Sequence, residues 1–114
     1  MDLTGKACLV TGATRGIGHA VAEALAAAGA DVVISARTAS DVEHVAKELG
    51  YAYAGRVVGI VADVSRPEDC THLVQESVDT LGRLDVLVNN AGVGILSSIE
   101  ELSVEEWETQ IHTN

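Results

Sequence analysis

The chain has 114 residues, of which 47% are apolar, so it is long enough to bury one hydrophobic core but not two. Its formal net charge of −10 disfavours nucleic acid or an anionic membrane as a partner, because their phosphates would meet net repulsion. With no secretion-signal pattern and no apolar run of about 18 residues, we expect a cytoplasmic protein with one domain over residues 1–114.

Four short apolar runs predict the strands of a parallel sheet. Each is free of charged residues and rich in Val, Ile or Leu, as is typical of strands that are buried on both faces. In chain order, the runs are residues 7–10, 32–34, 57–61 and 86–88. The spacing between them leaves room for a helix after each strand.

Helical patterns fill the first two of these intervals. The first helix has an apolar stripe at Ile17, Val21, Ala24, Leu25 and Ala28. Gly29 follows as a helix terminator. We expect the second helix to run from Ala39 to Leu49 and to be closed by Gly50. Its core face holds Val42, Val45, Ala46 and Leu49.

Two more helices are predicted in the second half of the chain. The third spans Pro67 to Leu81, with a capping-box spacing between Ser65 and Glu68 and with Gly82 at its end. Its core face holds Leu73, Val74, Val78 and Leu81. A fourth helix opens at Ser103, with an apolar line through Val104, Trp107 and Ile111. Strands and helices that alternate in this way predict an α/β doubly wound parallel sheet.

A glycine-rich turn separates the first strand from the first helix. It reads Thr-Gly-Ala-Thr-Arg-Gly-Ile-Gly over residues 11–18. Glycines here allow a sharp bend and a close backbone approach to a diphosphate, whose charge is met by the N–H groups of the helix N-terminus. The alternative is a purely structural tight turn.

The turn resembles the Thr-Gly-x-x-x-Gly-x-Gly cofactor motif of the short-chain dehydrogenases/reductases. Asp63-Val64 is similar to the adenine-contacting segment of that family, and residues 89–92 are similar to its Asn-Asn-Ala-Gly signature. Residues 107–114 resemble the helix that leads to its catalytic Asn, here Asn114. The resemblance spans the whole chain, and the 3-oxoacyl-thioester reductases are the commonest relatives of this kind.

The resemblance implies a Rossmann-type fold with strand order 3-2-1-4 and a cofactor site at the strand ends. Its implied cofactor-binding residues are Thr11, Gly12, Thr14, Arg15, Gly16, Ile17, Gly18, Arg37, Asp63, Val64, Asn90, Ala91 and Gly92. Outside the family context, Asp63 has a second interpretation as a cap for the following turn. Asn89 and Asn90 have one as turn formers, whereas the resemblance favours a role in holding the cofactor loop.

The end of the second strand favours NADP(H) over NAD(H). NAD-specific sites usually carry a carboxylate there, but this chain has Ala36 followed by Arg37. A guanidinium at Arg37 is suited to a 2′-phosphate, and Arg15 would add a second positive charge. The alternative is that Arg37 only solvates the strand end.

The family resemblance implies hydride exchange between nicotinamide and a small carbonyl or alcohol substrate. The resemblance implies a catalytic Tyr and Lys, a Ser and an Asn, of which only the Asn has a counterpart in this chain, at Asn114. Tyr51 and Tyr53 are followed four residues later by Gly55 and Val57, so neither forms the family's Tyr-x-x-x-Lys. We therefore expect a shortened, catalytically incomplete member: a gene fragment, an incomplete gene or a deliberately shortened protein.

Two other classes stay open at this point: a non-catalytic nucleotide-binding or regulatory module, and a relative that acts on nucleotide sugars, against which the Asn-Asn-Ala-Gly stretch argues. The complete protein is expected to form a homo-oligomer, as its relatives commonly do. We expect no metal site, since neither the histidines nor Cys8 and Cys70 have ligand spacing. Both thiols are expected to be buried. An exposed fourth strand predicts low stability for the isolated chain.

Overall fold

Strands and helices alternate in the predicted order. The computed structural model describes residues 2–90, and this part comprises four strands and three helices. In chain order they are β1 Ala7–Thr11, α1 Gly16–Ala27, β2 Asp31–Ala36, α2 Ala39–Ala52, β3 Val57–Val61, α3 Pro67–Leu81 and β4 Val86–Asn89. The helix predicted from Ser103 lies outside the described residues.

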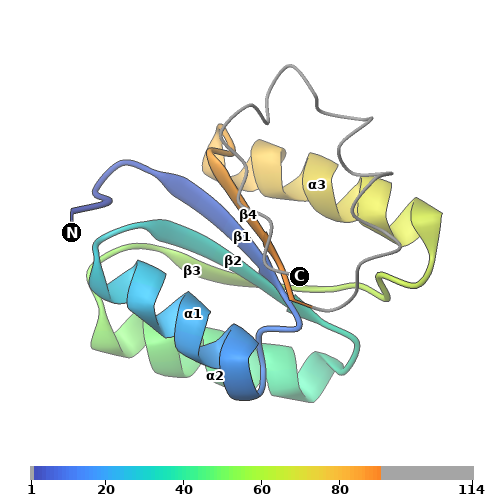
Figure 1. Ribbon diagram of the computed structural model, residues 1–114, viewed down its shortest axis with the longest axis horizontal. Coiled ribbons are helices and arrows are strands. Elements are labelled where there is room, and N and C mark those ends of the chain that lie inside the picture. Colours follow the sequence, from blue (N-terminus) through green and yellow to red (C-terminus); the bar gives the residue numbers. More distant parts are fainter. Residues whose placement is uncertain (1, 91–114) are drawn as a thin grey trace.

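The strands form one parallel sheet in the order β3-β2-β1-β4. On β1, Leu9 lies opposite Val33 of β2 and Leu87 of β4. Figure 1 shows α1 and α2 covering one face of the sheet and α3 the other. The predicted doubly wound α/β fold with strand order 3-2-1-4 is confirmed. All the strands end at the same edge of the sheet, which is where ligands bind in folds of this kind.

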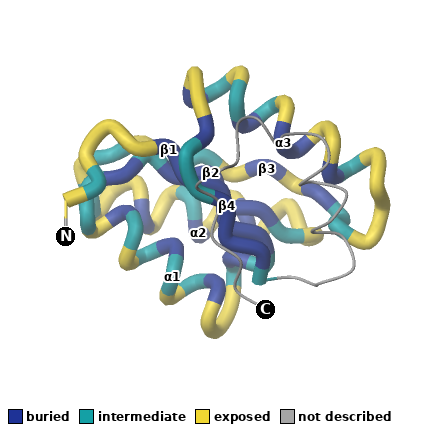
Figure 2. Tube along the Cα trace, turned by 45° about the horizontal axis from the view of Figure 1, so that its top comes forward, coloured by how far each residue is buried: buried dark blue, intermediate teal, exposed yellow. Residues whose placement is uncertain are grey.

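A separate hydrophobic cluster fills each face of the sheet, because successive side chains of a strand point to opposite faces. Leu9 and Val33 pack with Leu73 on the α3 side, whereas Val10 and Ile34 belong to the cluster under α1 and α2. Figure 2 shows the buried residues concentrated in the strands and on the helix faces turned toward them. This packing holds the strand ends in fixed positions.

The apolar stripe predicted for α1 is only partly right, since Val21 and Leu25 are partly buried and pack against the core. The buried residues are the small Gly18, Ala22 and Ala26, whereas the side chain of Ile17 is 73% exposed. Small residues at the most buried positions allow the helix to lie close to the sheet. The predicted stop is confirmed, since Gly29 follows the helix with a φ of 96°.

The predictions for α2 and α3 hold for their core faces but not for every boundary. Val42, Val45 and Leu49 are buried as expected, yet α2 continues through Gly50 to Ala52. The N–H of Tyr53 donates to the Leu49 carbonyl oxygen at 3.1 Å, which carries the helical pattern past the glycine.

The bounds of α3 and its end at Gly82, where φ is 84°, match the prediction. The capping box is wrong, because the Ser65 hydroxyl donates to Asp63 Oδ1 at 2.6 Å and does not cap the helix. The short side chain of Ser65 therefore stabilises the loop before α3.

β3 differs from the prediction of a strand buried on both faces. It pairs only with β2 among the described strands, and the side chain of Val61 is 48% exposed. An apolar run can belong to an edge strand, because periodicity does not report which strand becomes the neighbour.

The two cysteines are buried, as predicted, and lie on opposite faces of the sheet. Burial, with the nearby carboxylates of Asp85 and Asp31, raises the pKa of the Cys8 thiol to about 11. Such a thiol is unreactive at neutral pH.

Candidate functional site

The glycine turn leads into α1 without a side-chain cap from the residue that precedes the helix. Gly12 and Gly16 have φ values of 60° and 54°, which side-chain-bearing residues rarely adopt. The residue before the helix, Arg15, makes no side-chain cap, and the first turn of α1 carries no acidic residue. By contrast, Glu68 and Asp69 lie in the first turn of α3. The N-terminal dipole of α1 is therefore not offset by carboxylates of its own first turn, which suits an anion.

Gly18 sits where the helix meets the turn, and no larger residue fits there. A Cβ atom at this position would overlap the carbonyl oxygen of Gly12 and would lie 2.7 Å from Asn90 Nδ2. At Gly16 a Cβ would meet nothing within 4 Å, which leaves open space in front of the turn. The two glycines thus serve different purposes: close packing at Gly18 and a left-handed backbone beside open space at Gly16.

Hydrogen bonds from the end of β4 hold the start of the glycine turn in place. The Thr11 hydroxyl donates to Asn89 Oδ1 at 3.0 Å and accepts the N–H of Asn90 at 3.1 Å. Asn90 Nδ2 donates to the Gly12 carbonyl oxygen at 3.3 Å. These contacts join residues 78 or more positions apart in the sequence, so the two asparagines act as more than local turn formers.

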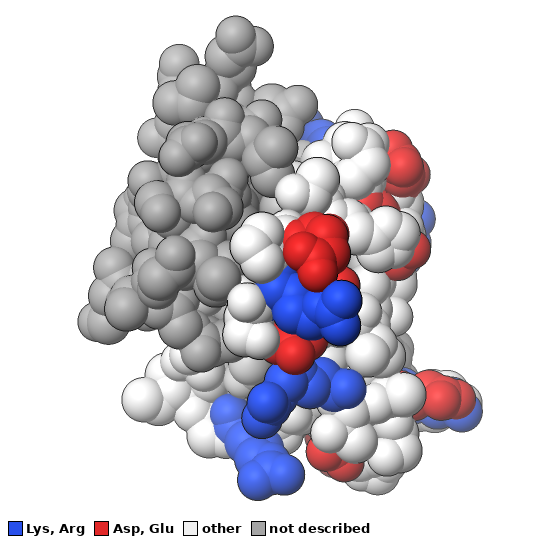
Figure 3. All heavy atoms as spheres, turned by 90° about the vertical axis from the view of Figure 1, so that its right-hand side faces the viewer, with Lys and Arg blue, Asp and Glu red and all other residues white. Residues whose placement is uncertain are grey.

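A cavity of about 710 Å³ opens beside the glycine turn, over the ends of β2 and β3. Apolar, hydroxyl, acidic and basic groups share its wall. It is lined by Gly12, Thr14, Arg15, Ser35, Ala36, Arg37, Thr38, Asp41, Ala62, Asp63, Val64 and Ser65. Figure 3 looks onto the end of the molecule where the strands finish and shows basic side chains grouped there. In residues 2–90, neither Arg15 nor Arg37 forms an ion pair.

Asp63 provides the acidic group of this cavity. Its Oδ1 accepts hydrogen bonds from the Ser65 hydroxyl at 2.6 Å and the Ser65 N–H at 3.0 Å. These bonds, helped by the positive charge of Arg37, hold the pKa of Asp63 below its ordinary value of 3.8 against the opposing effect of partial burial. The carboxylate therefore stays ionised near neutral pH, where it accepts hydrogen bonds but cannot donate one.

Most of the predicted site residues come together in the structure. Gly12, Thr14, Arg15, Arg37, Asp63 and Val64 line the cavity. Thr11, Asn90 and Gly18 form or support the turn, Gly16 begins α1, and Ile17 projects from its exposed start. Ala91, Gly92 and Asn114 lie outside the described residues.

Six residues of the wall were not predicted to line a site: Ser35, Ala36, Thr38, Asp41, Ala62 and Ser65. Asp41 lies in the first turn of α2, and the others lie at or just past the end of β2 or β3. The position of a residue relative to a strand end was the available signal, because parallel strands that finish at one edge bring such residues together.

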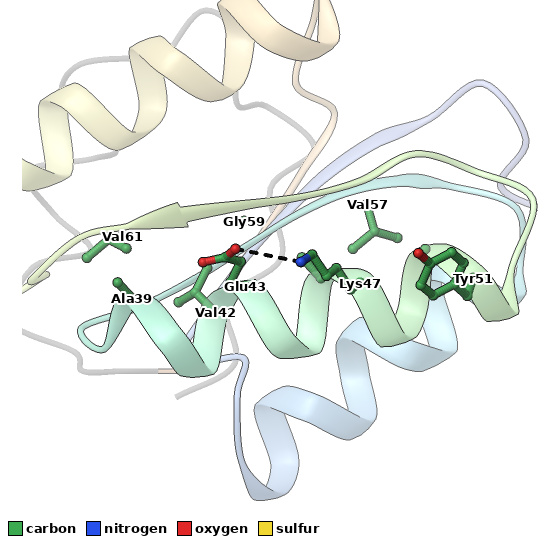
Figure 4. Close-up of a pocket in the computed structure, with 10 residues that line it drawn as sticks. Ala39, Val42, Glu43, Lys47, Tyr51, Val57, Gly59 and Val61 are labelled. Carbon is green, nitrogen blue, oxygen red and sulfur yellow. Dashed lines mark ion pairs between the residues drawn. The ribbon is translucent and has the colours of Figure 1, made fainter.

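A second cavity, of about 560 Å³, lies between α2 and the outer edge of β3. Figure 4 shows its labelled side chains, with Lys47 directed at Glu43. Lys47 Nζ lies 3.7 Å from Glu43 Oε1, and both side chains are largely exposed. The charged groups of this groove thus neutralise each other, whereas the two arginines of the first cavity have no ion pair in residues 2–90.

Comparisons with known proteins agree with this geometry. The family model for short chain dehydrogenases matches residues 6–114. The chain belongs to this family. Over all of its length it is 39% identical to an uncharacterized oxidoreductase of Staphylococcus saprophyticus, of which it covers 49%. It is 37% identical to the 3-oxoacyl-[acyl-carrier-protein] reductase of Synechocystis, with 98% of this chain and 45% of that protein aligned.

The similar solved structures are dehydrogenases and reductases. L-sorbose reductase from Gluconobacter frateurii, complexed with NADPH and L-sorbose, superposes with a TM-score of 0.90 at 27% identity, over 98% of this chain and 53% of that one. A hydroxysteroid dehydrogenase from Escherichia coli gives 0.86 at 29% identity, over 92% and 51%. The chain thus spans about half the length of these short chain dehydrogenases.

The described residues contain neither a metal cluster nor a helix suited to a membrane. No group of three or more His, Cys, Asp or Glu side chains there is arranged to hold a metal ion. Within the same part of the chain, none of the helices has the length and hydropathy needed to cross a bilayer.

Proposed function

We propose that this chain is the nucleotide-binding half of an NADP(H)-dependent oxidoreductase that exchanges hydride with a small carbonyl or alcohol substrate. The observation that carries the proposal is the pair of arginines, Arg15 and Arg37, in the wall of a cavity that the glycine turn borders. Ala36 stands where an NAD-specific site would place a carboxylate. Membership of the short chain dehydrogenase family and the NADPH bound in the similar L-sorbose reductase structure support the same function.

The residues fit a dinucleotide in three places. The amides at the start of α1 would hold the diphosphate, since Arg15 does not cap them and no acidic residue lies in the first turn. Arg37, with Arg15, would bind the 2′-phosphate through charge-assisted hydrogen bonds. Asp63 would accept a hydrogen bond from the adenine amino group. Bound NADP(H) supplies the nicotinamide ring that exchanges the hydride.

Proton transfer is the part of the reaction that this chain does not supply in our proposal. Neither Tyr51 nor Tyr53 has a lysine four residues on. Ala91 and Gly92 as cofactor contacts, Asn114 as a relay residue, the cytoplasmic location and the homo-oligomer all stay predictions. A non-catalytic nucleotide-binding module is the competing proposal. Reading the gene downstream of Asn114 separates the two, because an open frame with Ser and Tyr-x-x-x-Lys supports the enzyme and a stop codon supports the module.

The cofactor preference is tested with two fragments that differ by a single phosphate. In the full-length protein we expect adenosine 2′,5′-bisphosphate to bind at least tenfold more tightly than 5′-AMP, as measured by calorimetric titration. Arg37→Ala should remove most of that difference. The control is Arg56→Ala, which deletes the same charge at the opposite end of the sheet, where Arg56 contacts the Thr80 carbonyl oxygen. Equal affinities for the two fragments in the wild type would contradict the NADP(H) assignment.

A further inference from the structure

A row of three buried polar residues crosses the sheet just below the glycine turn. Thr11 at the end of β1 lies opposite Ser35 on β2 and opposite Asn89 on β4. All three are 3% exposed or less. Since Leu9 and Val33, two residues earlier, face the α3 side, the alternation of strand side chains directs the row to that same side.

One end of this row is bonded and the other is not. The Thr11 hydroxyl donates a hydrogen bond to Asn89 Oδ1 and accepts one from the Asn90 N–H. A bond between neighbouring Thr and Ser hydroxyls is a common way to satisfy such a pair in a sheet. Here, however, Ser35 Oγ is the only buried side-chain nitrogen or oxygen without a hydrogen-bond partner in the described part of the chain.

Ser77 shows how this protein treats a buried serine elsewhere. It is also 0% exposed, and its hydroxyl donates to the Leu73 carbonyl oxygen at 2.7 Å within α3. Burial of a hydroxyl without a partner destabilises a fold, so such groups are rare and point to a partner that the protein itself does not provide. Ser35 is therefore the exception that needs a physical explanation.

The location of Ser35 supplies that explanation. Ser35 lines the cavity beside the glycine turn. On the side of β2 away from Thr11, its partner in the sheet register is Ile60 of β3. The walls next to it include Ala36, Ala62 and Val64, which suit a flat base, whereas the charged groups for phosphates are Arg15 and Arg37. We propose that the Ser35 hydroxyl is a hydrogen-bonding contact for the adenosine part of the nucleotide. This inference rests on the proposed function and adds a binding residue to it.

The proposal predicts that Ser35→Ala separates binding from stability in the full-length protein. The variant should bind both 5′-AMP and adenosine 2′,5′-bisphosphate about five- to tenfold more weakly, because both contain adenosine. Inorganic pyrophosphate, which lacks the nucleoside, should bind as tightly as to the wild type. The thermal midpoint of the ligand-free variant should be equal to or higher than that of the wild type, since an unpaired buried hydroxyl has been removed.

Ser77→Ala is the matched control, with the same chemical change at a buried, bonded serine outside the cavity. It should lower the thermal midpoint and leave all three affinities unchanged. An affinity of Ser35→Ala for 5′-AMP within twofold of the wild type overturns the proposal. A lower midpoint with unchanged affinity likewise overturns it and assigns the hydroxyl to a structural water. If the wild type binds neither adenosine ligand, the proposed function itself fails. If the wild type binds 5′-AMP and adenosine 2′,5′-bisphosphate equally, only the NADP(H) preference fails. The affinity of Ser35→Ala for 5′-AMP then still decides whether Ser35 contacts adenosine.

Discussion

The arginines beside the glycine turn differ in their partners from the arginines where the strands begin. Where the strands begin, Arg83 and Arg56 pair with Asp85 and Asp31. These carboxylates also accept backbone N–H groups, from Ala7 at 2.9 Å and from Arg56 at 2.8 Å. Where the strands finish, Arg15 and Arg37 line a cavity without an ion pair among the described residues. The pairs at the first end stabilise the fold, and our proposal assigns the two arginines at the second end to a ligand.

This division follows from the parallel sheet. Every strand finishes at the same edge, so the loops there converge on one space, and the helix N-termini that follow them add a positive potential. At the opposite edge the loops lead out of helix C-termini into strands. Substitutions at the two ends should therefore affect different properties, with binding lost at one end and stability at the other.

The largest effect is expected at Gly18, where the two properties meet. Gly18→Ala places a methyl group against the Gly12 carbonyl oxygen and should weaken NADPH binding more than tenfold. Forced repacking should also lower the free energy of unfolding by about 1–3 kcal/mol. Gly50→Ala is the control, since a Cβ there meets nothing within 4 Å inside α2 and should stabilise by up to about 1 kcal/mol. Fluorescence titration measures the NADPH affinity, and urea unfolding measures the free energy of unfolding. Unchanged NADPH affinity in Gly18→Ala would contradict the close packing.

A change at the strand-start end should act on stability alone. Asp85→Ala leaves the Ala7 N–H without its acceptor and removes the partner of Arg83, so we expect a loss of about 1–3 kcal/mol in unfolding free energy. Affinity for adenosine 2′,5′-bisphosphate should stay within twofold of the wild type. Asp79→Ala, at an exposed position on α3 where the carboxylate accepts a hydrogen bond from Gln75, should change stability by less than about 0.5 kcal/mol. A binding defect in Asp85→Ala would argue against the separation of the two ends.

The smallest effect is the pH dependence of Asp63. Its folded-state pKa lies below the ordinary 3.8, so its carboxylate stabilises the fold above that pH, and the contribution is lost as the pH falls through the lower folded value. Ser65→Ala removes the strongest hydrogen bond to Asp63. It should therefore raise the pH at which this contribution is lost, which NMR titration of the Asp63 carboxyl carbon measures directly. An unaltered titration curve in Ser65→Ala would show that the Ser65 hydroxyl does not control the acidity of Asp63.

Local sequence patterns determined the order of strands and helices and the place of the glycine turn. They also indicated that Arg37 follows the second strand without a carboxylate before it. Each of these depends on residues close together in the chain, where periodicity, glycines and charge act directly. The core face of α2 and the end of α3 at Gly82 were predictable for the same reason.

Tertiary structure decided what depends on a neighbour distant in sequence. Close packing on the sheet selected Gly18, Ala22 and Ala26 as the buried face of α1, although a stripe of larger apolar residues competed for that place. The absence of a second neighbour among the described strands made β3 an edge. Ser35 became an unpaired hydroxyl only because Thr11, brought beside it in the sheet, already bonds Asn89 and Asn90. Hydrogen-bond partners and burial are properties of the assembled sheet, so no local pattern within one segment reports them.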